Sequence, residues 1–76
     1  MEFKMNAKEL DTNKIKVPDW ATWVAQDCLG NWWAFEFVPV IDSLGCWSAP
    51  DGDFKEIGEG SIDVPWQRTL QRVNNI

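Results

Sequence analysis

The sequence predicts an α+β fold in which a three-stranded antiparallel meander packs with a short C-terminal helix. From Asp19 onward, apolar and polar residues alternate with a period of two, as expected for half-buried strands. Two short segments that contain Asp and Gly, at 27–30 and 42–45, separate the apolar runs and are typical of hairpin turns. After residue 63, the apolar spacing changes to that of one helix face.

The N-terminal part differs from the rest of the chain. Residues 1–18 are expected to form a mobile arm, and residues 19–76 a single small α+β domain. Within the arm, Asn6 is followed three residues later by Glu9, a pattern that resembles a capping box. A turn or two of helix is therefore expected there, and Pro18 ends it before the first strand.

Two longer strands are expected at 19–26 and 31–41, joined by a loop at 27–30. Aromatic and β-branched side chains are dense in the second of these strands, as strands favour. Pro39 has no backbone N–H to donate, so the end of that strand is expected to lie at an edge or a bulge. A short third strand follows at 46–49.

The C-terminal third of the chain is predicted to be irregular and then helical. Residues 51–61 contain three glycines and are expected to form a polar loop. Pro65 fits the first turn of a helix, where its missing N–H costs nothing. The helix would then place three apolar side chains on one face, namely Trp66, Leu70 and Val73.

The first hairpin determines which aromatic side chains are buried. A four-residue loop places Gln26 opposite Asn31, and Trp33 then belongs to the core face. Replacing Trp33 by alanine is therefore predicted to cost about 3–5 kcal/mol of stability. Trp23 and Trp32 share the other face, surrounded by small side chains. That face is covered by another part of the chain, forms the seam of a homodimer, or docks another protein.

The charge distribution bears on partners. The chain carries 12 acidic and seven basic side chains, for a formal charge of −5, and the acids are concentrated between residues 19 and 63. Binding to nucleic-acid phosphates requires a basic patch, so direct nucleic-acid binding is not expected. An acidic surface attracts a basic partner instead. The alternative is that the acids only keep an aromatic-rich chain soluble.

No arrangement of residues indicates catalysis, and we expect a non-enzymatic protein without a cofactor or metal. The chain has no His to act as a base, and its two Cys cannot complete a four-ligand soft-metal site. Cys28 and Cys46 are expected to be free thiols. The strand between their turns would hold these turns roughly 30 Å apart, whereas a disulfide needs Cα atoms within about 7 Å.

No targeting or membrane-spanning segment is expected. The first residues contain no apolar run of signal-peptide length. Polar or helix-breaking residues interrupt the longest apolar stretches well short of the ~20 residues that span a bilayer. We therefore expect a cytoplasmic protein without a membrane partner.

The candidate partner-binding residues combine the second sheet face with the central acids. Trp is enriched at the energetic centres of interfaces, and exposed apolar patches usually mark a partner site. The candidates are Trp23, Trp32, Glu36, Asp51, Asp53 and Glu56.

The aromatic hairpin also resembles a known group of proteins. The runs at 19–27 (DWATWVAQD) and 30–36 (GNWWAFE), with the ending at 66–70 (WQRTL), are similar to a pattern in small uncharacterised bacteriophage and prophage proteins. Because these motifs are structural rather than catalytic, no functional residues carry over. The resemblance implies an accessory phage protein in the bacterial host cytoplasm that binds and modulates or inhibits a host protein. Its alternatives are an acidic decoy that mimics nucleic acid, or a structural or assembly component of a virion.

Overall fold

The computed structural model describes residues 15–73, and within that range the chain consists of strands and one 3-10 turn. The elements are β1 (Trp23–Gln26), β2 (Asn31–Phe35), β3 (Val40–Ile41), β4 (Trp47–Ser48), β5 (Phe54–Glu59), η1 (Trp66–Arg68) and β6 (Gln71–Arg72). The α+β prediction is therefore wrong, because this part of the chain contains no α-helix. Nor does it contain a helix long and apolar enough to cross a membrane.

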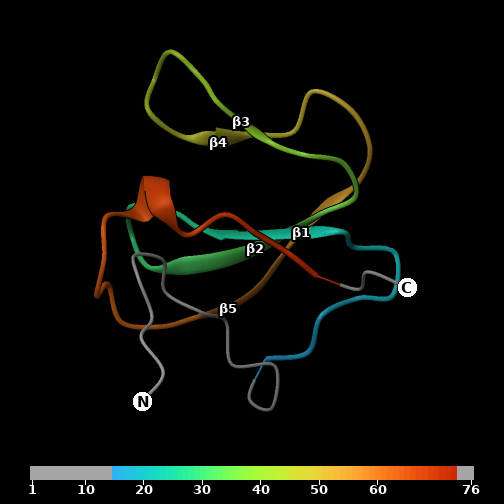
Figure 1. Cartoon of the computed structure of the whole chain (residues 1–76), viewed down its shortest axis with the longest axis horizontal. Helices are drawn as coiled ribbons and strands as arrows, with labels where there is room; N and C mark the ends of the chain where they lie inside the picture. Colours follow the sequence, from blue (N-terminus) through green and yellow to red (C-terminus); the bar gives the residue numbers. More distant parts are fainter. Residues whose placement is uncertain (1–14, 74–76) are drawn as a thin grey trace, which may run out of the picture.

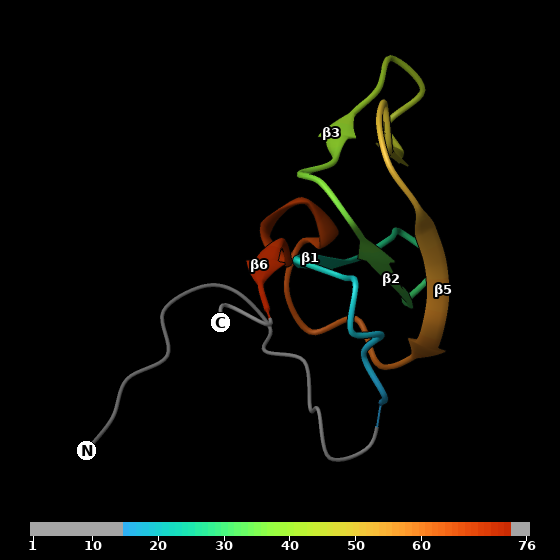
Figure 2. The same ribbon diagram turned by 90° about the vertical axis from the view of Figure 1, so that its right-hand side faces the viewer.

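The strands form two antiparallel sheets. The larger sheet has the order β5-β2-β1-β6, and the smaller one pairs β3 with β4. Figures 1 and 2 show the β3–β4 hairpin raised above the four-stranded sheet. The predicted meander is wrong in this respect, because its third strand belongs to a separate sheet. β2 ends before Pro39, which has no N–H for continuing the ladder.

The segment predicted as a C-terminal helix is a 3-10 turn followed by a strand. The N–H of Arg68 donates to the Pro65 carbonyl, and the N–H of Thr69 donates to the Trp66 carbonyl. The chain then straightens, and β6 pairs with the outer edge of β1. A helix of this length is marginal on its own, whereas β6 gives hydrogen-bond partners to a strand edge that would otherwise lack them.

The segment predicted as a polar loop at 51–61 contains the longest strand described, β5. It pairs along the whole of β2, from Phe35 opposite Phe54 to Asn31 opposite Glu59, with an irregularity between Trp32 and Trp33. Gly58, one of the three glycines that led to the loop prediction, has a packing role. A Cβ atom there would lie 3.0 Å from the Ile15 side chain.

The register of the first hairpin differs from the prediction by one residue. The N–H of Asp27 donates to the Asn31 carbonyl at 2.9 Å, so the loop has three residues rather than four. Gln26 consequently lies opposite Trp32 instead of Asn31. Because side chains alternate along a strand, this shift exchanges the faces of Trp32 and Trp33.

The hydrophobic core lies on the face of the sheet that carries Trp32. Its buried members are Ala21, Val24, Trp32 and Ala34, with Ile15, Val17, Ile57 and Val73 packed against them. Ile15 and Val17 belong to the segment predicted as a mobile arm, and here they lie against the core. The helical turn predicted near Asn6 lies outside the described residues, which begin at Ile15.

A buried polar pair connects the hairpin to the C-terminal segment. The N–H of Gln26 donates to the Thr69 hydroxyl oxygen at 2.8 Å, and both residues are fully buried. The Gln26 side-chain amide also donates to the carbonyls of Gly30, Gly60 and Ser61 at 3.0–3.2 Å. Buried polar groups are costly unless hydrogen-bonded, so these contacts specify where residues 60–69 lie.

Candidate functional site

The two hairpin loops have the same sequence pattern and the same construction. Both read Asp-x-Leu-Gly, at 27–30 and 42–45. In each loop, the Gly N–H donates to the Asp carbonyl at 3.0 Å, and the Gly has a positive φ. In each, one Asp carboxylate oxygen also accepts from the N–H groups two and four residues later, at 2.9–3.0 Å. Each loop is therefore held in one shape by its own residues.

Each of these loops presents a leucine to solvent. Leu29 is 78% exposed and Leu44 is 86% exposed. We call these two residues the leucine tips. A single exposed leucine is ordinary, but two on loops of the same construction indicate a contact surface when both loops border one cleft.

Such a cleft lies between the four-stranded sheet and the β3–β4 hairpin, with a volume of about 440 Å³. The sheet contributes Trp33, Phe35 and Phe54, and the hairpin contributes Trp47, Ser48 and Ala49. The loop ends contribute Asp27, Cys28, Leu29, Asp42 and Cys46. Its volume lies within the range of ligand pockets, and its walls are largely aromatic.

Hydrogen bonds and ring contacts fix the aromatic walls. The indole N–H of Trp47 donates to the Gln26 carbonyl at 3.0 Å, which anchors the hairpin on β1. On its other side, Trp47 meets Trp66 edge-to-face with ring centroids 5.9 Å apart. The indole N–H of Trp33 donates to Asp27 at 2.8 Å, and its ring lies 6.1 Å from that of Phe54. The cleft is therefore bounded by side chains that have few other positions available.

The two tryptophans predicted to form a docking face lie on opposite faces of the sheet. Trp32 is 1% exposed and belongs to the core, so it has no surface to offer a partner. Trp23 is half-buried, and the Arg72 guanidinium lies 5.7 Å from the centre of its ring. The face that combined both indoles depended on the predicted register and does not exist in the structure.

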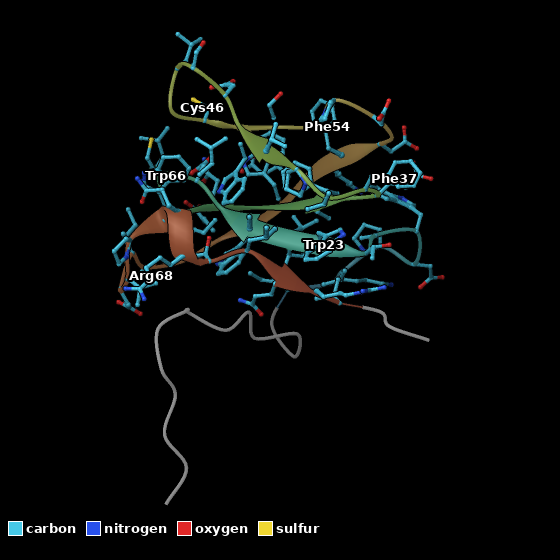
Figure 3. The ribbon with its side chains drawn as sticks, turned by 45° about the horizontal axis from the view of Figure 1, so that its top comes forward. Trp23, Phe37, Cys46, Phe54, Trp66 and Arg68 are labelled. Atoms are coloured by element: carbon cyan, nitrogen blue, oxygen red, sulfur yellow. The ribbon has the colours of Figure 1, made fainter. Side chains whose placement is uncertain are left out.

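The predicted acidic site residues lie outside the cleft. Glu36 accepts a hydrogen bond from the Asp53 N–H at 3.0 Å, which joins the ends of β2 and β5. Asp51 and Glu56 are exposed. Figure 3 shows Phe37, the neighbour of Glu36, at the opposite side of the molecule from Cys46, which lines the cleft. The structure thus brings Glu36 and Asp53 together, but away from the leucine tips.

None of the residues that line the cleft was among the predicted site residues. Trp47 and Phe54 received no role, and the two acids of the loops were taken only as turn residues. The signal that could have found the site is the repeated Asp-x-Leu-Gly pattern, because the same loop chemistry twice implies two similar tips. That the tips flank one cleft depends on how the second hairpin folds back.

Both cysteines are free, as predicted, and the structure shows that both are exposed. The distance argument behind that prediction is wrong, because it assumed that the second hairpin continues the meander. In the structure the β3–β4 hairpin folds back toward the first, and Cys28 and Cys46 line the same cleft.

Their exposure leads to a test. Both thiols should react with iodoacetamide in the folded protein at rates close to those of a free peptide thiol, because neither is shielded. Mass spectrometry over time would follow the two modifications. A rate that approaches the peptide value only in denaturant would show that one thiol is covered in solution.

The arrangement suits binding. Among residues 15–73, no group of three or more Cys, Asp or Glu side chains is placed to hold a metal ion. The cleft offers aromatic walls, two carboxylates and the exposed Leu29, and the ends of the loop that carries the exposed Leu44 also line it. Comparison with protein-family models, curated proteins and solved structures finds no match for this chain.

Proposed function

We propose that this chain is a non-enzymatic binding protein that holds a partner protein at the cleft and the leucine tips. The observation that carries the proposal is the pair of exposed leucines. Each lies on a loop that is held by its own hydrogen bonds, and both loops border one aromatic cleft. Loops that are already ordered lose little conformational entropy on binding, which favours affinity. Apolar groups held beside a pocket match the anchor arrangement of interface centres.

A different protein is a better partner than a second copy of this chain. The chain has a net charge of −5, so two copies that meet at acidic clefts would repel each other. A partner with a basic surface would be attracted instead. The resemblance of the hairpin to small phage and prophage proteins makes a bacterial host protein the expected partner, and modulation or inhibition of that protein the expected effect.

A pair of leucine substitutions tests this proposal. The double variant Leu29→Ser and Leu44→Ser should retain the wild-type melting temperature within a few degrees, because both side chains already face solvent. It should bind the partner at least about thirtyfold more weakly, the loss expected for interface anchors. The partner would be captured from bacterial lysate with wild-type protein, purified, and titrated calorimetrically against wild type and variants.

Val38→Ser is the matched control for the leucine substitutions. Val38 is also exposed, but it follows β2 at the end remote from the 27–30 loop and does not line the cleft. Its substitution should change the affinity less than twofold. Equal binding by wild type, control and double variant would reject the cleft as the contact site. Dimers that the double variant abolishes would reassign the surface to self-association.

A further inference from the structure

The carboxylates at the mouth of the cleft differ in their hydrogen bonding. One oxygen of Asp27 accepts from two backbone N–H groups, and the other accepts from the Trp33 indole. Asp42 accepts from the N–H groups of Leu44 and Cys46 through a single oxygen, Oδ1. Within the part of the chain that the structure describes, Oδ2 of Asp42 has no hydrogen-bond donor. It can therefore accept from a ligand without breaking the loop.

Among residues 15–73, no basic side chain lines the cleft beside its two acids. The described basic side chains are Lys16, Lys55, Arg68 and Arg72, and none of them lines it. Arg72 is already engaged with the Trp23 ring. Figure 3 shows Arg68 on the opposite side of the molecule from Cys46, pointing outward. Two carboxylates beside aromatic rings, with no cation from the described part of the chain, form a site complementary to a positive group.

The geometry points to an arginine side chain of the partner protein as the occupant of the cleft, an inference that rests on the proposed function. Guanidinium groups stack on aromatic faces and donate to carboxylates from the same plane. The rings of Trp33 and Trp47 provide the walls, and Oδ2 of Asp42 provides the acceptor. The methylene stem of an arginine is apolar and would pack against Leu29 at the mouth of the cleft.

A side chain of a protein fits these features better than a free small molecule. A ligand confined to the cleft would leave the tip of the second loop uncovered, because Leu44 does not line the cleft and is 86% exposed. A protein surface that inserts an arginine would cover both leucine tips at the same time. The charge of the acidic chain would also speed the approach of a basic surface.

The test uses wild-type protein and a matched pair of ligands. N-acetyl-arginine amide and its uncharged isostere, N-acetyl-citrulline amide, would be titrated while the indole N–H resonances of Trp33 and Trp47 are followed by NMR. Both groups are hydrogen-bonded at the cleft and report on it directly. The arginine compound should shift both resonances in a saturable manner, and citrulline should bind at least about fivefold more weakly, as expected for loss of a cation–π contact and an ion pair.

Two variants test whether arginine binding depends on the carboxylate of Asp42. Asp42→Asn retains Oδ1 for the loop but removes the charge, and it should weaken arginine binding about fivefold. Asp51→Asn makes the same change of charge outside the cleft and should leave binding within twofold. Equal shifts with citrulline, or no saturable shift with arginine, would overturn the inference. Partner binding that still depends on the leucine tips would then leave the proposed function standing.

Discussion

Replacing Trp32 by alanine is expected to remove about 3–5 kcal/mol from the free energy of unfolding. Trp32 is 1% exposed and is the largest fully buried side chain of the described core. Domains of this size are stable by only about 4–11 kcal/mol, so this loss removes a substantial share of the total stability. Urea titration followed by circular dichroism would measure the loss.

Trp33→Ala is the matched control, because it removes the same indole from the next residue of the same strand. Trp33 is only half-buried and lies at the cleft, so its loss is expected to cost about 1–2 kcal/mol. The sequence-based register predicted the larger cost for Trp33. A greater loss for Trp33→Ala than for Trp32→Ala would support that register and contradict the pairing of Gln26 with Trp32.

Replacing Gly30 by alanine is expected to cost about 3 kcal/mol or more. Two effects combine at this position. Gly30 has a φ of +93°, a conformation that costs an L-residue about 1–2 kcal/mol. A Cβ atom would also lie 2.7 Å from the Gly60 carbonyl oxygen, which is backbone and accepts a hydrogen bond from Gln26. Chemical denaturation of the variant would measure the change.

Gly45→Ala separates these two effects, because the second loop has the same construction. Gly45 has a φ of +80°, but a Cβ atom there would meet nothing within 4 Å. The free energy of unfolding of this variant should therefore fall only by the conformational penalty, about 1–2 kcal/mol. The difference between the two variants gives the cost of displacing residues 60–61 from the hairpin. Equal losses would show that Gly60 does not pack on the first loop in solution.

The sequence predicted the two hairpin turns better than the sheet. Both hairpin turns were located correctly, because an Asp, a Gly and their neighbours fix a turn through contacts within five residues. The loop length was wrong by one residue, because the pattern does not reveal that Asp27 still pairs with Asn31. That one-residue difference exchanged the faces of the β2 side chains relative to those of β1. The candidate site built on Trp23 and Trp32 was lost with it.

The sequence by itself determined that strands would alternate with turns that begin with Asp and end with Gly. The tertiary structure decided which strands are neighbours, because β5 and β6 find their partners through contacts distant in sequence. Thr69, for example, bonds to Gln26 across 43 residues, and no local pattern encodes such a contact. The cleft also depends on contacts between segments distant in sequence. Its walls come from the four-stranded sheet and from the β3–β4 hairpin, which is held against β1 where Trp47 donates to the Gln26 carbonyl. Contacts between neighbouring residues determine the turns, whereas a site between two sheets forms only when segments distant in sequence pack together.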